Sequence, residues 1–92
     1  MENIKKLIEE INSRKPKKYE QMKIEEISKE LHYVMKFEQD TIKKINLFEK
    51  DHQDIDLIKY ARIICRNTVE RETSLIQETY LKKIDSKYLN SK

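Results

Sequence analysis

The 92-residue chain contains no glycine and only one proline, and this absence restricts its fold more than any other feature. Glycine is the residue that tolerates positive φ. Tight β-hairpins, phosphate-binding loops, dinucleotide-binding fingerprints and EF-hand turns therefore depend on it. A β-sandwich or barrel of this length needs many turns, and the residues that make turns are missing. The sequence predicts an all-α protein with few chain reversals.

The first predicted helix covers residues 2–13. Its apolar residues recur at the i, i+3, i+4, i+7 spacing of one helical face, and charged residues fill most positions between them. They are Ile4, Leu7, Ile8 and Ile11. Pro16 ends this helix because proline lacks a backbone N–H and pushes the residue before it out of the α region. Proline also suits the first turn of a following helix, so the next helix is expected to start at once.

The second predicted helix covers residues 17–50. Its expected buried stripe consists of Ile24, Ile27, Leu31, Val34 and Met35, followed by Ile42, Ile45 and Phe48. Glu38 stands where the stripe should continue, so a kink or a rotation is expected there. Three apolar residues, Tyr33, Phe37 and Leu47, lie off this stripe and widen the apolar surface toward a second neighbour.

The third predicted helix covers residues 55–84, after a break in which Asp54 is the expected N-cap. Its stripe consists of Ile58, Ala61, Cys65, Val69, Ile76, Tyr80 and Ile84, flanked by Leu57, Ile64, Leu75 and Leu81. Between Arg66 and Ser74 only Val69 is apolar, so the middle of this helix is expected to face solvent or a polar interface. The tail, residues 85–92, is expected to fray.

Two helices of this length would form a hairpin about 45–50 Å long, and a thin hairpin buries a small fraction of its surface. The widened apolar surface of the second helix therefore predicts a partner: a second copy of the chain in a four-helix bundle, a homodimer, or another protein subunit. Tyr33, Phe37 and Leu47 are the residues expected to bind it. The other interpretation is a monomeric three-helix bundle.

The formal net charge is only +3, too small to indicate nucleic acid as the partner. The distribution is uneven: residues 1–23 and 57–92 carry a basic excess, and residues 24–56 an acidic one. Antiparallel pairing of the second and third helices is therefore modestly favoured. A single cysteine, Cys65, fits a reducing interior, and no apolar run is long enough to span a bilayer. A soluble cytoplasmic protein without membrane association is expected.

No motif for catalysis or metal binding is recognisable. His32 and His52 lack the spacing of a zinc site, and the aspartates near residue 54 lack the glycine of a calcium loop. Cys65 falls on an apolar stripe, which favours a buried small side chain over a nucleophile. We expect no catalytic residues, no metal and no cofactor, and the chain is not expected to be an enzyme.

The basic residues support an alternative function. Lys59, Arg62 and Arg66 share one face of the third helix, and a second group, Arg14, Lys15, Lys17 and Lys18, stands beside Tyr19. One interpretation is solvated surface, paired in part with Glu70 and with the acidic second helix. The other is contact with phosphate or an acidic protein, since arginine forms bidentate pairs. On the second interpretation the chain is a small nucleic-acid-binding or viral regulatory protein.

The order of elements also carries a family resemblance. An amphipathic helix precedes Pro16–Glu20, where a proline and an aromatic residue lie close together; after a long helix comes the arginine-spaced segment Ile58–Arg66, continuing to Arg71 and Ile76. In this order, residues 1–80 resemble the helical domain of GINS subunits, accessory factors of the replicative helicase in archaea and eukaryotes. The chain departs from that pattern in having no leucine before its proline and no second aromatic beside its tyrosine. The resemblance implies a scaffold subunit that joins other subunits and catalyses nothing.

Overall fold

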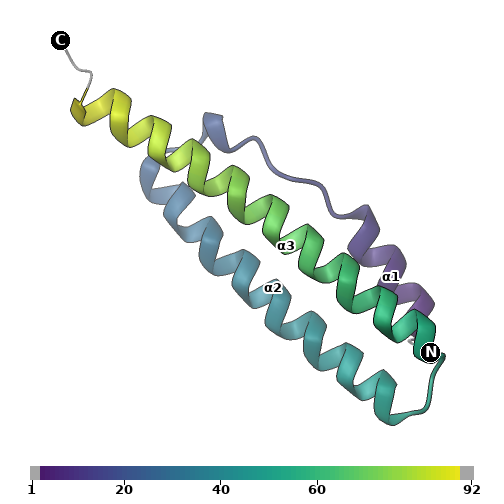
Figure 1. Cartoon of the computed structure of the whole chain (residues 1–92). Coiled ribbons are helices and arrows are strands. Elements are labelled where there is room, and N and C mark those ends of the chain that lie inside the picture. The colour runs from purple at the N-terminus through teal and green to yellow at the C-terminus, as the bar shows by residue number, and fades with distance from the viewer. Residues whose placement is uncertain (1–2, 90–92) are drawn as a thin grey trace.

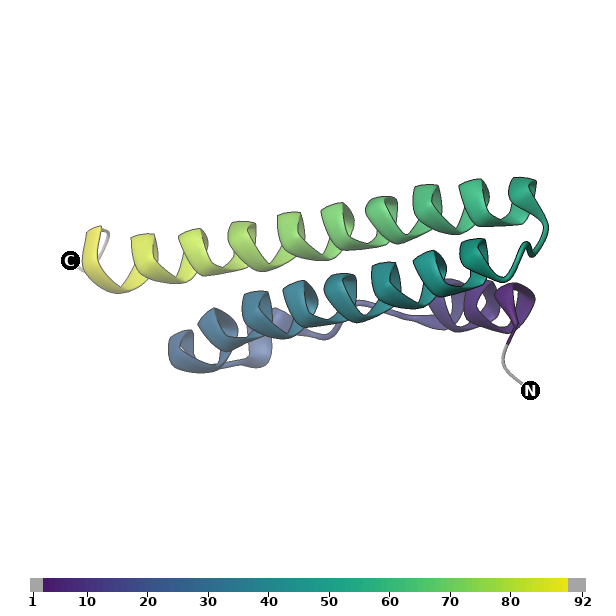
Figure 2. The same ribbon diagram turned by 90° about the horizontal axis from the view of Figure 1, so that it is seen from below.

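The structure, a computed structural model, describes residues 3–89 and is all-α in that range. Its elements are α1 (Ile4–Ser13), a 3₁₀ turn η1 (Tyr19–Gln21), α2 (Ile24–Lys50), α3 (Ile55–Ile84) and a wider helical turn η2 (Asp85–Leu89). The two long helices pack as an antiparallel hairpin, and α1 lies against the first half of α3 (Figures 1 and 2). The molecule is elongated, with extents of 60 × 17 × 16 Å. The predicted fold, a short helix followed by two long ones, is confirmed.

The N-terminal end of α1 is held by side chains. The Asn3 side chain accepts a hydrogen bond from the Lys6 amide, and Gln53, in the turn between the long helices, accepts one from the Ile4 amide at 2.9 Å. These bonds satisfy donors that the first turn of a helix otherwise leaves free. The predicted start at residue 2 lies outside the described residues.

The predicted start of the second helix is wrong. Pro16 does not open a helix; residues 14–23, here called the linker, are non-helical apart from η1, and α2 begins at Ile24. The linker contains residues that would form a helix readily, but two of its side chains are held by the hairpin. Lys17 pairs with Glu30, and Tyr19 is 3% exposed. Tertiary contacts have overridden local helix propensity here.

The turn between α2 and α3 is a Schellman motif built without glycine. The amide of Gln53 donates to the Phe48 carbonyl and the amide of His52 to the Glu49 carbonyl, while His52 has φ 56°. Glycine normally occupies this left-handed position, because a Cβ atom is unfavourable there. Asp54 then accepts hydrogen bonds from the Asp56 and Leu57 amides, which confirms it as the N-cap of α3.

Substitution His52→Gly is expected to stabilise the protein. The left-handed conformation is unfavourable for a residue with a Cβ atom, and the His52 side chain is exposed. We expect the free energy of unfolding to rise by about 0.5–1 kcal/mol, less the extra entropy that glycine adds to the unfolded chain. Urea denaturation followed by circular dichroism measures this change. A loss of stability would contradict the assignment of strain to this turn.

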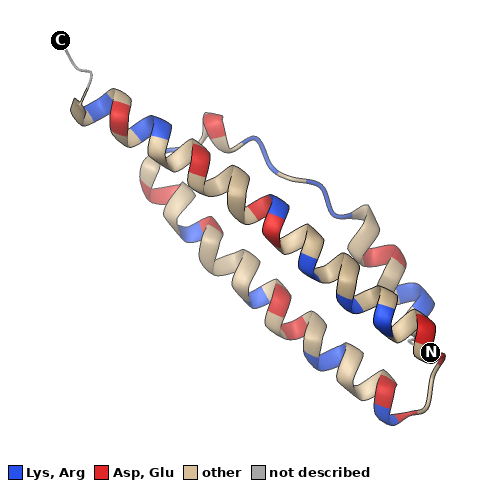
Figure 3. Cartoon of the chain, viewed as in Figure 1, with Lys and Arg blue, Asp and Glu red and all other residues tan. Residues whose placement is uncertain are grey.

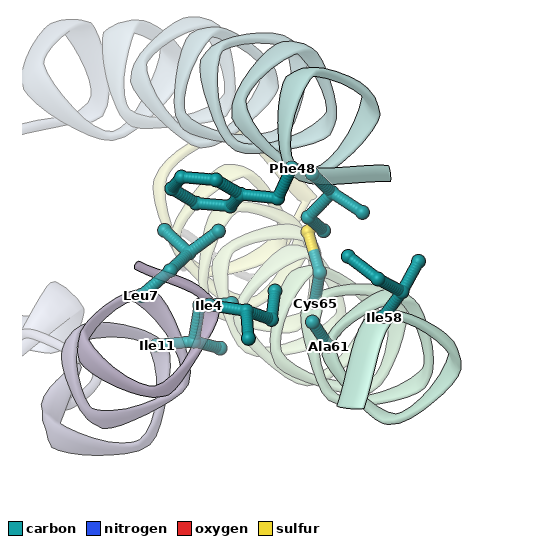
Figure 4. Close-up of a cluster of buried hydrophobic side chains, with 8 residues drawn as sticks. Ile4, Leu7, Ile11, Phe48, Ile58, Ala61 and Cys65 are labelled. Carbon is teal, nitrogen blue, oxygen red and sulfur yellow. The ribbon is translucent and has the colours of Figure 1, made fainter. Parts of the chain in front are cut away.

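The core consists of two apolar clusters. The first joins all three helices at the turn end of the hairpin (Figure 4); its buried residues are Ile4, Leu7, Ile11, Ile45, Phe48, Ile58, Ala61 and Cys65. The second, toward the other end, is smaller, and its buried residues are Tyr19, Ile27, Val34 and Ile76. Buried polar residues also lie on the helix faces between and beside these clusters: Glu30, Thr41, Thr68 and Glu72.

The predicted stripe of α2 is wrong at two positions. Met35 is 57% exposed and Ile42 42% exposed, whereas Thr41 and Glu30 are buried. The buried face of α2 includes the polar residues Glu30 and Thr41. Met35 and Ile42 lie to one side of that face, on a flank of the helix. On α3 the predicted positions Ile58, Ala61, Cys65 and Ile76 are buried, whereas Val69, Tyr80 and Ile84 are half-buried. Residues 85–89 of the tail continue as the helical turn η2, which buries none of its residues; residues 90–92 lie outside the described range.

Candidate interaction site

Two carboxylates are buried in the hairpin, and each forms an ion pair with a basic side chain of the linker. Arg14 Nε lies 2.7 Å from Glu72 Oε2, and Lys17 Nζ lies 2.8 Å from Glu30 Oε1. The Glu72 and Glu30 side chains are only 2% and 7% exposed. A buried carboxylate without a partner is strongly unfavourable, so these pairs fix the linker on the hairpin.

Aromatic contacts strengthen this attachment. The Arg14 guanidinium lies 4.1 Å from the centre of the Phe37 ring, and the Lys17 ammonium lies 5.9 Å from that of Tyr33. The hydrogen bond to Glu30 raises the pKa of Lys17, and burial raises the pKa of the Tyr19 hydroxyl. The linker thus closes one side of the α2–α3 hairpin.

These contacts bear on the two interpretations of the polar middle of α3, solvent exposure and a polar interface. Both apply: Glu72 faces a polar interface with the chain's own linker, whereas Asn67, Glu70 and Arg71 are exposed to solvent. Arg14 and Lys17 are therefore engaged within the molecule, whereas Lys15 and Lys18 are exposed and form no ion pair with any residue in the range 3–89.

The basic face of α3 is only partly free. Arg62 forms two hydrogen bonds to the Glu49 carboxylate, at 2.9 and 3.1 Å, and one to Asn46. This pairing lowers the pKa of Glu49 and raises that of Arg62. Lys59 and Arg66 are exposed, and the expected pair of Arg66 with Glu70 is not among the ion pairs of the described residues.

The two predicted basic groups do not form one surface. The linker lies against both long helices, through Glu30 and Phe37 of α2 and Glu72 of α3. Arg66 instead lines a cleft between α2 and α3 to which the linker contributes no residue. Basic segments alternate with acidic ones along α2 and α3 instead of gathering on one side (Figure 3). A continuous basic track of the kind that follows a nucleic-acid backbone is not formed by residues 3–89.

The three residues expected on the partner surface lie in different environments. Phe37 is half-buried, packs on the first core cluster and is covered by Arg14. Tyr33, 54% exposed, lies beside Lys17, and Leu47 is 59% exposed. The linker is thus the neighbour of Phe37 and Tyr33. The second apolar surface of α2 that the sequence predicted is in part a contact within the chain.

A different apolar surface is open. Met35 and Ile42 are seven residues, or two turns, apart and so share one flank of α2. Beside them is a cleft of about 180 Å³, lined by Glu38, Ile42, Arg62, Cys65 and Arg66. Neither α1 nor the linker contributes a residue to this cleft. We call this surface, defined by Met35, Glu38, Ile42, Arg62 and Arg66, the open face.

The chemistry available at the open face is limited. Cys65 is buried at the base of the cleft, and burial together with the negative charge of Glu38 raises the pKa of its thiol. A thiol in this state is a poor nucleophile. Among the described residues, no three of histidine, cysteine, aspartate and glutamate converge as metal ligands would. No helix in this range is long and apolar enough to cross a membrane. The open face therefore offers apolar contact and three charged side chains, of which Arg62 is already paired with Glu49.

Comparison of the chain with protein-family models, with curated protein sequences and with solved structures found no match. The resemblance to the helical domain of GINS subunits stays a prediction.

Proposed function

We propose that this chain is a non-enzymatic interaction subunit, which joins an intracellular protein assembly by packing the open face of its α2–α3 hairpin against helices of another polypeptide. The observation that carries the proposal is the one-sided covering of the hairpin. The linker and α1 close one side, and the other side leaves Met35 and Ile42 exposed next to a cleft. Amphipathic helices bind partners through such surfaces, with apolar side chains at helical spacing as the main contacts.

The resemblance to GINS subunits supports the same kind of role, and it makes a DNA-replication assembly the setting to examine first. Direct binding of nucleic acid is less well supported. Three of the basic residues predicted for it, Arg14, Lys17 and Arg62, are paired with carboxylates of the chain itself.

The test uses substitutions at exposed positions, which the fold tolerates. We expect Met35→Lys combined with Ile42→Lys to leave the far-ultraviolet circular dichroism spectrum unchanged. The double variant should reduce at least tenfold the amount of a specific protein that co-purifies with the tagged chain from its native cells. Leu81→Lys is the matched control, since Leu81 is 66% exposed and lies on α3 far from the cleft. If the co-purified protein is recovered in equal amount with the wild type, the double variant and Leu81→Lys, the proposal is wrong.

Fluorescence anisotropy with labelled single-stranded and duplex DNA and RNA tests the alternative. A nucleic-acid-binding protein should bind with an affinity that falls steeply between 50 and 200 mM salt. Such binding, lost in a Lys59→Glu and Arg66→Glu double variant, would replace the interaction subunit with a nucleic-acid-binding regulator. We expect no binding at physiological salt.

A further inference from the structure

The open face has a charge pattern that complements itself. Glu38 on α2 and Arg66 on α3 both line the cleft, and neither forms an ion pair with any other described residue. Arg62, in the same cleft, is already paired with Glu49. The open face thus presents one unpaired acid on α2 and one unpaired base on α3.

Resting on the proposed function, we infer that the partner at the open face is a second copy of this chain, related by a two-fold axis parallel to the helices. This rotation places α2 of each copy on α3 of the other. Glu38 of each protomer then faces Arg66 of its partner, and both ion pairs form at once. An interface in which the same patch is used twice is the commonest form of homodimer.

The apolar residues fit this arrangement. Met35 lies three residues before Glu38 and Ile42 four residues after it, so the two flank the ion pairs at about 4.5 and 6 Å along the helix. The rotation places both residues of each protomer against α3 of the other. They would form one apolar layer on each side of the charged layer, and Met35 and Ile42 would lose the 57% and 42% exposure that they have in the single chain.

Helix direction and contact area fit as well. Within one chain α2 and α3 are antiparallel, and the rotation makes each contact between protomers antiparallel too, as in an up-and-down four-helix bundle. A contact along the full length of α2, about 40 Å, and across the full 17 Å width of the molecule would have a flat footprint of at most about 700 Å² on each protomer. Stable interfaces bury about 800 Å² on each partner.

The first experiment is light scattering after size exclusion at about 0.15 M salt and 100 μM protein. The expected mass is twice the 11.3 kDa of the chain. Ile42→Lys should give a monomer with an unchanged circular dichroism spectrum, and Leu81→Lys should remain a dimer. A monomeric wild type, or a dimer that Ile42→Lys leaves intact, would overturn the inference.

Charge reversal tests the pairing itself. Glu38→Arg alone and Arg66→Glu alone should each raise the dimer dissociation constant at least tenfold, because like charges then face each other twice. The two single variants, mixed, should form a heterodimer with near wild-type affinity, since every pair is then complementary again. If the mixture dimerises no better than the separate variants, this two-fold arrangement is wrong.

These results separate the inference from the proposed function. Suppose that the wild type is monomeric, and that a protein co-purifies with it but not with the Met35→Lys and Ile42→Lys double variant. The open face then binds a different polypeptide, and only the inference fails. If the wild type is monomeric and the same proteins co-purify with the wild type and with the double variant, both the inference and the proposed function fail.

Discussion

Replacing Arg14 with methionine is expected to lower the free energy of unfolding by about 3 kcal/mol. Glu72 is 2% exposed, and Arg14 is the only cation paired with its carboxylate among the described residues. Removing one partner of a buried ion pair leaves the other charge buried without a counter-charge, which costs about 3–5 kcal/mol. The lower end applies because Arg14 itself is 30% exposed, so water can reach the vacated site. Methionine retains part of the apolar contact with the Phe37 ring.

A second substitution identifies the cause of this loss. In the double variant Arg14→Met and Glu72→Leu, no unpaired charge is left buried at this position, and stability is expected to return to within about 1 kcal/mol of the wild type. Lys15→Met is the matched control, since Lys15 is exposed in the same linker, and should change stability by less than about 0.5 kcal/mol. Urea denaturation followed by circular dichroism measures all of these variants. If the double variant is no more stable than Arg14→Met alone, burial of an unpaired carboxylate is not the reason for the loss.

The fold was predictable from the sequence because its main signals are local. Three signals act within a few residues: the absence of glycine, the apolar spacing of residues 4–11 and the cap at Asp54. The structure confirms what each of them predicted, namely the all-α fold, α1 and the start of α3. Periodicity also placed Ile58, Ala61 and Cys65 in the core correctly. These patterns depend on helix geometry alone, so no knowledge of neighbouring elements was needed.

The linker and the open face were not predictable in this way. The start of α2 and the exposure of Met35 and Ile42 depend on which side of the hairpin the linker covers, and that choice is made by contacts between distant residues. One signal was present. Glu30 lies three residues after Ile27 and four before Val34, a position on the buried stripe, and Glu72 stands four residues before Ile76. A charged residue at a stripe position indicates a buried partner, and the basic linker was the nearest source of one.

Tyr19 is the residue that holds the linker on the second core cluster. Its side chain is 3% exposed and packs with Ile27, Val34 and Ile76, at the end of the hairpin that α1 does not reach. Tyr19→Ala removes a large buried aromatic ring and is expected to lower the free energy of unfolding by about 3–4 kcal/mol. A domain of this size is stable by about 5–14 kcal/mol, so this loss removes a large part of the total.

The loss in Tyr19→Ala should have a local signature. Without the ring the linker should detach from Glu30, and hydrogen exchange should accelerate at residues 24–34 and 72–80, while residues 4–11 and 45–65 keep their protection relative to global unfolding. Tyr19→Phe is the control: it keeps the ring and should cost no more than about 1 kcal/mol. Acceleration that is uniform along the chain would mean that the two core clusters unfold as one unit. The linker would then belong to a single cooperative core, and it would not detach as a separate segment.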